Sequence, residues 1–289
     1  MAYKFFLKDN MFLLIVALIF LATSCSQTDP TRYVDPNIGG VAPLLTTKNP
    51  TVHRPNGMVR VFPVTEPGLS DRYLSDKIYG FAFNMPAYRM GHVSDLMPYH
   101  GELTADRGRT AAFYDHDFEE VHPWHHKVFL EDAGIVAEWT TTERAVVYRF
   151  DFPEKDFNHL IFRTQGNGHF DIGNNVISGW EEFQDTRQYF YAESNCPVVS
   201  SGFVESGEMR PGLSELSGHH LAAYFSFDNL ESPVELRIGI SYIDTDQARK
   251  NLESETGLRS FEEIKDESYG IWKDALGKIR ITGGTERQK

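Results

Sequence analysis

Histidines in the stretch from His116 to His126 are the first candidates for metal chemistry. His122, His125 and His126 lie close together in the sequence. Imidazole nitrogen is a preferred zinc ligand, but a metal site needs several ligands on the same side of the backbone. Adjacent residues of a strand point to opposite faces, so His125 and His126 could not share a metal ion there. The spacing therefore disfavours a metal site.

Paired carboxylates are a second candidate, because a glycosidase cleaves a sugar bond between two carboxyl groups that face each other. Glu119-Glu120 and Glu181-Glu182 are adjacent pairs, and neighbours on a strand again point apart. In a chain with a formal net charge of −13, we expect most acidic side chains to be solvated at the surface. Motifs of serine hydrolases, phosphate loops and zinc proteases are absent from the sequence. The residues alone predict no catalytic constellation.

Two loops rich in polar side chains suggest sugar binding instead. The first runs from Asn49 to Arg60, where two prolines and a glycine shape a loop that carries His53, Arg54 and Asn56. Those side chains supply donors and acceptors of the kind that bind sugar hydroxyls. A turn with incidental polar groups explains the same composition equally well.

The second loop runs from Asn84 to Pro98 and carries Tyr88, Arg89, His92 and Asp95. We predict substrate contacts from six residues of the two loops: His53, Arg54, Asn56, Arg89, His92 and Asp95. None of these residues is predicted to be catalytic or to bind a metal.

Short strands must hold these loops, and the sequence predicts strands from Tyr33 to about Ile243. They share an alternation of apolar and polar residues and a high content of Val, Phe, Tyr and Trp: Val128–Trp139, Arg144–Phe152, His159–Arg163, Gln188–Ala192, Leu221–Phe227 and Val234–Ile243. Turn-forming clusters such as Gly166-Asn167-Gly168 separate them. Many strands without intervening helices predict an all-β sandwich or barrel.

The pattern becomes helical after Asp244. Asp246 is a predicted cap for a helix over Gln247–Glu255, and Gly257 is predicted to end it. A strand is predicted at Lys278–Thr282.

A second helix is predicted to start at Ser260, because Glu263 three residues later gives the spacing of a capping box. Its apolar residues recur at helical spacing on one side: Phe261, Ile264, Ile271, Trp272, Ala275 and Leu276. This stripe either packs on the sandwich or docks a second domain.

The first residues are typical of an export signal. Lys4 and Lys8 precede an apolar run from Met11 to Leu21, which is shorter than the roughly 20 residues that span a bilayer. Ala22-Thr23-Ser24-Cys25 follows and resembles a bacterial lipobox, in which Cys25 becomes the lipidated first residue. We therefore expect an exported lipoprotein of a Gram-negative bacterium, in the outer membrane or periplasm, that meets the membrane only through its lipid anchor.

The net charge of −13 disfavours nucleic acid as a partner, because a phosphate backbone requires clustered Lys and Arg. It suits a domain with a neutral partner such as a sugar. Besides Cys25 the chain has one cysteine, Cys196, so acylation of the first excludes an internal disulfide. We expect Cys196 to be an ordinary core residue.

In order along the chain, several segments resemble glycoside hydrolase family 92, a family of calcium-dependent exo-α-mannosidases. Tyr33–Gly39 resembles the family's Tyr-Val-x-Pro-x-Ile-Gly motif, Pro55–Val59 its Pro-Phe-Gly-Met-Val motif, and Asp95–Pro98 its Asp-x-x-Met-Pro motif. Ala137–Arg144 resembles Ala-Glu-Leu-Thr-x-Thr-x-Arg, and Gly239–Ile243 with Gln247–Glu255 resembles Gly-Ile-Ser followed by Gln-Ala-x-x-Asn-Leu. Trp272–Gly284 resembles the family's segment that begins Trp-x-x-x-Leu. The resemblance is collinear from Tyr33 to Lys289.

The resemblance implies a large antiparallel β-sandwich of the galactose-mutarotase-like (supersandwich) type, followed by two linker helices. In the family this sandwich packs on an (α/α)6 barrel that carries the catalytic acid and base and most calcium ligands, and terminal α-mannose is hydrolysed with inversion. The barrel is expected to be missing from this chain, so calcium and catalysis are expected only of the full enzyme. The implied ligand is a mannose-containing glycan.

The implied division of the chain is a signal peptide at 1–24, a lipidated tether at 25–32, the sandwich at 33–245, and linker helices with the start of the barrel at 246–289. The chain departs from the family around Thr46–Val52 and Asn84–Arg89, two loops expected to face the pocket at the domain boundary, so the exact sugar stays open. Two alternatives stay open as well. One is a stand-alone sugar-binding lipoprotein, and the other is an inert remnant or truncated gene product.

Overall fold

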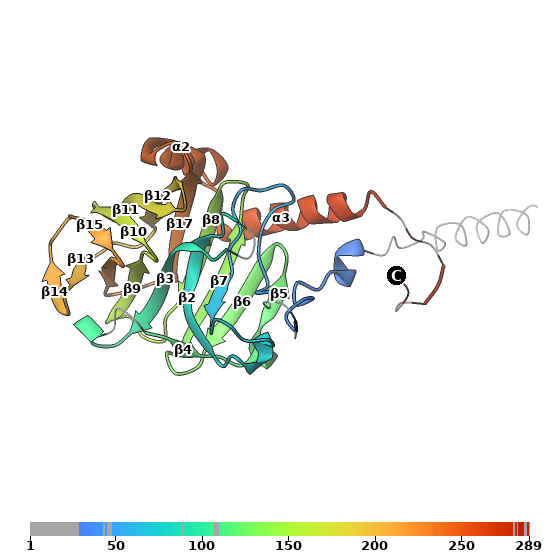
Figure 1. Ribbon diagram of the computed structural model, residues 1–289, viewed down its shortest axis with the longest axis horizontal. Coiled ribbons are helices and arrows are strands. Elements are labelled where there is room, and N and C mark those ends of the chain that lie inside the picture. Colours follow the sequence, from blue (N-terminus) through green and yellow to red (C-terminus); the bar gives the residue numbers. More distant parts are fainter. Residues whose placement is uncertain are drawn as a thin grey trace, which may run out of the picture.

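The computed structural model describes residues 29–279, apart from residues 43, 45–47, 88–89 and 107–109, together with residues 281, 283–285 and 288. Two antiparallel sheets form a sandwich, and two helices follow it in the chain (Figure 1). The predicted all-β sandwich with two C-terminal helices is therefore confirmed. The predicted signal peptide and Cys25 lie outside the described residues.

The first sheet has eight strands in the order β1-β2-β3-β9-β16-β13-β14, with β4 paired to β2. Their bounds are β1 Pro63–Thr65, β2 Lys77–Asn84, β3 Val93–His100, β4 Ala112–Phe113, β9 Asn158–Arg163, β13 Ser200–Glu205, β14 Glu208–Pro211 and β16 Ala222–Phe227. Short 3-10 helices lie before and between these strands: η1 Pro30–Tyr33, η2 Arg72–Leu74 and η4 His116–Phe118.

The second sheet has nine strands in the order β15-β10-β11-β12-β17-β8-β7-β6-β5. Their bounds are β5 Glu120–His122, β6 His125–Leu130, β7 Ile135–Thr141, β8 Ala145–Asp151, β10 Asn167–Ile172, β11 Val176–Phe183, β12 Thr186–Ser194, β15 Glu215–His219 and β17 Val234–Ser241. The predicted strand over Val128–Trp139 is wrong in one respect. It is a hairpin, because Gly134 adopts φ 66° in a turn between β6 and β7.

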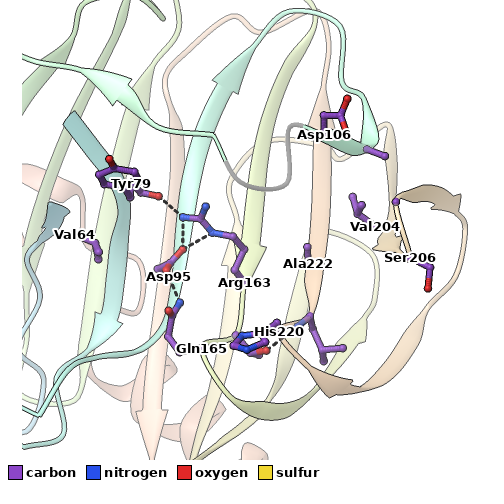
Figure 2. A pocket seen from close by; sticks show the side chains of 14 residues that line it. Val64, Tyr79, Asp95, Asp106, Arg163, Gln165, Val204, Ser206, His220 and Ala222 are labelled. Atoms are coloured by element: carbon purple, nitrogen blue, oxygen red, sulfur yellow. Dashed lines mark hydrogen bonds and ion pairs between the residues drawn. The ribbon is translucent and has the colours of Figure 1, made fainter. Parts of the chain in front are cut away.

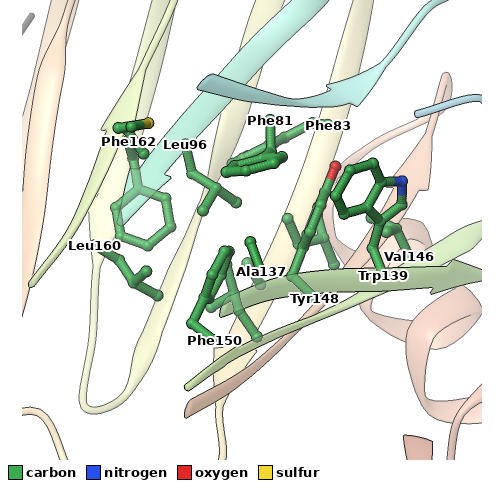
Figure 3. Packing of buried hydrophobic residues seen from close by; sticks show 14 of the residues in the cluster. Phe81, Phe83, Leu96, Ala137, Trp139, Val146, Tyr148, Phe150, Leu160 and Phe162 are labelled. Atoms are coloured by element: carbon green, nitrogen blue, oxygen red, sulfur yellow. The ribbon is translucent and has the colours of Figure 1, made fainter. Parts of the chain in front are cut away.

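Aromatic side chains fill the space between the sheets (Figure 3). Phe81 of the first sheet lies 5.2 Å from Trp139, 6.0 Å from Tyr148 and 6.0 Å from Phe150, ring centre to ring centre, and those three belong to the second sheet. All four are fully buried, and burial of one such side chain contributes roughly 1.5–3 kcal/mol. Alternation along the strands places these residues inward. Cys196 is also buried in this core, as predicted.

The first helix, α2, spans Thr245–Glu255 and covers β12 and β17 (Figure 1). Its cap is Asp244, whose carboxylate accepts from Gln247 N at 2.7 Å, two residues before the predicted cap Asp246. Gly257 follows the helix with φ 48°, as predicted for a helix end. Among the described residues, no helix is long and apolar enough to cross a membrane.

The second helix, α3, spans Phe261–Leu276 and has the predicted capping box between Ser260 and Glu263. Phe261 and Ile264 are buried against Val147 of β8, so the first half of the apolar stripe packs on the sandwich. The second half extends beyond the sandwich (Figure 1). Lys278 and Ile279 form a turn and a bend after the helix, so the prediction of a strand over Lys278–Thr282 is wrong for these two residues.

Candidate functional site

The two predicted loops lie together at one end of the sandwich. Arg60 N donates to Asn84 Oδ1 at 2.9 Å, and Met85 N donates to Arg60 O at 2.9 Å. Farther along both segments, the rings of Phe62 and His92 meet edge to face with centres 5.9 Å apart. The second predicted loop is shorter than expected, because Asn84 belongs to β2 and Val93–Pro98 belong to β3. The role of these residues in sugar binding stays a prediction.

His53 lies against the part of α3 that leaves the sandwich. Its carbonyl oxygen accepts from Trp272 Nε1 at 2.8 Å, and the two rings are perpendicular at 5.3 Å. Burial and the positive charge of Arg60 lower the pKa of the His53 imidazole, although a hydrogen bond from the imidazole to the backbone of Thr51 acts in the opposite direction. A neutral imidazole both donates and accepts hydrogen bonds, which suits a hydroxyl-bearing ligand.

Arg54 is buried and its guanidinium holds α3. Its Nε donates to Thr141 O at 3.1 Å and to Ser268 Oγ at 3.0 Å, while its Nη2 lies 2.5 Å from Glu267 Oε2. Sequence reasoning predicted a sugar contact for Arg54. The structure instead commits its Nε and Nη2 atoms to the junction between sandwich and helix.

Asn56 is exposed at the tip of the first loop, in the left-handed conformation with φ 63°. The turn is closed by Gly57 N, which donates to Arg54 O at 2.8 Å. Arg89, predicted for the second loop, lies outside the described residues.

His92 and Asp95 belong to one polar cluster. Arg163 and Gln165, which sequence reasoning missed, complete it around Asp95 (Figure 2). Asp95 Oδ1 accepts from Arg163 Nε at 2.7 Å, and Asp95 Oδ2 accepts from Gln165 Nε2 at 2.6 Å. His92 Nε2 lies 3.1 Å from Asp95 Oδ2. Asp95 is 4% exposed, so this carboxylate is satisfied within the protein.

A cavity of about 740 Å³ opens beside this cluster on the outer face of the first sheet (Figure 2). Its lining includes Asp95, Arg163, Gln165, Ser206 and His220. The cavity falls within the size range of small-ligand sites.

Glu181 fixes the backbone around the cluster. Its Oε2 accepts from Ser94 N at 2.7 Å and from Ser94 Oγ at 2.8 Å, and its Oε1 accepts from Gln165 N at 2.8 Å and from Gly166 N at 2.7 Å. Burial raises the pKa of this carboxyl despite the four hydrogen bonds that lower it. Its 2% exposure contradicts the expectation of a solvated acid. Alternation along β11 places Glu181 on the inward face with Ile177, which is the signal that could have identified it.

Glu119 is a second buried acid where a solvated one was expected. It accepts from Arg72 Nη2 at 3.2 Å and lies 2.9 Å from His116 Nδ1 and 3.3 Å from His126 Nε2. Burial alone would raise the pKa of Glu119, but hydrogen bonds with the two histidines hold it well below its usual range.

Adjacent histidines of β6 have different partners, as the strand geometry predicts. His126 contacts Glu119 and stacks on Trp139 at 4.3 Å, whereas His125 Nε2 lies 3.0 Å from Glu138 Oε2. Within the part of the chain that the structure describes, no three His, Cys, Asp or Glu side chains gather as a metal site would need. Calcium binding by the full enzyme stays a prediction.

Residues 33–241 match the N-terminal domain of glycosyl hydrolase family 92. A curated relative, described as an uncharacterized secreted glycosidase of Arthroderma benhamiae (strain ATCC MYA-4681 / CBS 112371), is 26% identical over 218 residues. The alignment covers 60% of this chain and 27% of the relative.

Two solved structures from Bacteroides thetaiotaomicron, the first of them from strain VPI-5482, share the fold at 22% identity. A family 92 inverting mannosidase superimposes with a TM-score of 0.81 over 91% of this chain and 38% of its own. A family 92 α-mannosidase in complex with mannoimidazole gives 0.77 over 89% of this chain and 38% of its own. The chain thus spans about a quarter to two fifths of the length of these relatives.

Proposed function

The chain belongs to glycosyl hydrolase family 92 through its N-terminal domain, and on that premise we propose that it forms one wall of the sugar pocket of an α-mannosidase. The substrate is a glycan with terminal α-mannose. The neighbours whose descriptions name mannosidase activity, one of them bound to mannoimidazole, support this choice of sugar.

The junction between the sandwich and α3 carries the proposal. Arg54 and His53, both in the first loop, hold α3 through Glu267, Ser268 and Trp272. Asp29, in the stretch predicted to be a tether, accepts from Tyr269 Oη on the same helix. The end of the sandwich that carries the polar loops is therefore the end at which α3 leaves. A domain that follows α3 would meet those loops directly.

In this arrangement the residues of the two loops have distinct tasks. His53 and Asn56 face the boundary and contact the sugar, together with Arg89 of the second loop. Arg54 positions α3 rather than the sugar, and His92 and Asp95 support the second loop from beneath. The acid and the base of hydrolysis, and the calcium site, belong to the (α/α)6 domain of the full protein.

Export as a lipoprotein is part of the same proposal. The relative described as secreted supports export, and the apolar run before Cys25 supports a lipid anchor. A glycan-degrading enzyme at the cell envelope meets its substrate outside the cytoplasm.

The coding sequence after codon 289 is the first test, because the proposal expects a continuation that encodes a helical barrel. The protein with that continuation should release mannose from α-mannosides. His53→Ala should reduce kcat/KM at least tenfold, with Ser178→Ala on the outer face of β11 as the matched control. A stop codon would favour the stand-alone binding module, and equal activity of both variants would contradict the sugar contact proposed for His53.

A further inference from the structure

The cavity beside Asp95 has the features of a ligand site in its own right. Asp95 of β3 pairs in register with Arg163 of β9, while the next pair, Leu96 and Phe162, points into the core. Asp95 and Arg163 therefore point to the outer face of the sheet. Their side chains are only 5% and 14% exposed, so they form a recessed polar floor and not a surface ion pair (Figure 2).

Several structural features hold this floor in place. Glu181 bonds Ser94 and the amides of Gln165 and Gly166, so one buried carboxylate fixes a neighbour of Asp95 and the backbone of Gln165. Ser94 has φ 44°, a left-handed conformation that costs a non-glycine residue energy inside a strand. Strain held by a buried polar group is typical of functional sites.

Gly80 of β2 makes room for the ion pair. A Cβ atom at this position would lie 2.6 Å from Arg163 Nη2 and 2.8 Å from Asp95 Oδ1, closer than such contacts occur. Arg163 Nη2 also donates to Tyr79 O. The guanidinium is thereby held close to the backbone of β2.

The free hydrogen-bonding atoms of the floor suit hydroxyl groups. Arg163 Nη1 and Gln165 Oε1 have no partner among the described residues, so the lining of the cavity offers a donor and an acceptor on either side of Asp95. A hydroxyl group, which both donates and accepts, satisfies such a pair. Apolar side chains of Val204 and Leu221 line the same cavity and can pack on the C–H groups of a sugar ring.

The charge of the cavity selects a neutral ligand. The positive charge of Arg163 is already paired with Asp95, and Asp106 adds a second carboxylate to the lining. A phosphate or carboxylate ligand would have to compete with Asp95 for the same guanidinium and approach Asp106 as well. A neutral polyhydroxy ring meets no such repulsion.

We propose that this cavity binds a neutral hexopyranose unit of a glycan, as a site separate from the wall formed by His53 and Asn56. The choice of mannose as the sugar rests on the proposed function, whereas the position of the site does not. Such a site would hold a second unit of a branched glycan while its terminal mannose lies at the domain boundary.

Titration of the chain with methyl α-D-mannopyranoside, followed by amide chemical shifts in NMR, tests the site. A ligand of this size should bind with a Kd on the order of 1 mM, and the shifts should concentrate at residues 94–96, 163–166 and 220–222. Ala222→Leu, at the position opposite Arg163 on the neighbouring strand, fills the cavity beside the polar floor and should raise Kd at least tenfold. Ala275→Leu on α3 is the matched control and should leave Kd unchanged.

Inorganic phosphate serves as the charged probe and should produce no shifts in the cavity. Tyr79→Ala, on the cavity lining, provides a second variant that should also weaken binding if Ala222→Leu fails to fold. Shifts confined to residues 53–60 would overturn the cavity and leave the proposed function intact. Absence of mannoside binding at 50-fold the expected Kd, or binding unchanged in the cavity variants, would overturn the inference as well. Cavity binding with an inactive full-length protein would instead overturn the proposed function alone.

Discussion

Arg54 and Glu267 are 213 positions apart in the chain, yet Arg54 Nη2 lies 2.5 Å from Glu267 Oε2. Arg54 is almost fully buried, whereas the Glu267 side chain is 43% exposed, so solvent screens part of this pair. The stronger contribution comes from the neutral partners of Arg54 Nε, Thr141 O and Ser268 Oγ, which are buried with it. One arginine of the first loop thereby fixes the direction in which α3 leaves the sandwich.

Arg54→Ala should loosen α3 while the sandwich remains folded. Loss of these hydrogen bonds leaves buried acceptors unsatisfied, which should lower the free energy of unfolding by about 1–3 kcal/mol. Urea titration gives this value, and hydrogen exchange should show faster exchange in 261–276 than in the strands. Arg249→Ala, which removes ion pairs on the exposed side of α2, should change stability by less than about 0.5 kcal/mol. Equal effects of the two substitutions would contradict the role given to Arg54.

Gly80→Ala should displace the ion pair of Asp95 and Arg163, because the added methyl group would overlap both side chains. We expect a loss of about 1–3 kcal/mol, typical of overpacking at a buried position, and altered amide shifts around Asp95. Gly173→Ala is the control, since its Cβ would find its nearest neighbour at 3.8 Å. If the two variants are equally stable, Gly80 does not make room for the pair.

Glu138 should contribute stability that acid removes. Burial alone would raise the pKa of this carboxyl, but hydrogen bonds with His125 and Arg149 lower it from 4.5 to about 2. The folded state therefore binds the proton more weakly than the unfolded state. Its contribution is complete above pH 4.5 and is lost as pH falls toward 2.

Glu138→Gln should remove about 1–3 kcal/mol at neutral pH and flatten the fall in stability between those two pH values. Denaturation measured at several pH values gives the comparison. Glu120→Gln, at an exposed position paired with Lys127, should keep the slope of the wild type. A slope unchanged by Glu138→Gln would refute the assignment.

Much of the fold was predictable because its elements obey local rules. Alternation located β8, β9, β16 and β17 to within a few residues, and the capping box located α3. The hairpin between β6 and β7 was missed because Val128 to Trp139 keeps its apolar pattern through the turn. The position of Gly134 was the local signal for that turn.

The site was less predictable, because its contacts are not local. His92 and Asp95 were identified from composition, but their partners Arg163 and Gln165 are brought to them by the pairing of β3 with β9. Arg54 was predicted to contact the sugar from the first loop, and only the packing of α3 shows that it is buried and bonded to the helix. Sequence spacing gives the face of one strand, whereas register between distant strands decides which residues meet.

Cys25 is predicted to carry a lipid, although it lies outside the described residues. Labelling of cells with a fatty-acid analogue should mark the wild-type protein and not Cys25→Ser. Cys196→Ser controls for nonspecific thiol labelling, because Cys196 is buried in the core. Equal labelling of wild type and Cys25→Ser would refute the lipid anchor.

Mannose release by the isolated chain tests the proposed division of labour between the sandwich and the catalytic domain most directly. Because the acid and the base are assigned to the helical domain, the chain alone should release no mannose from α-mannosides in the presence of calcium. Turnover by the isolated chain that disappears when one of its own carboxylates is replaced, for example in Glu181→Gln, would contradict that division.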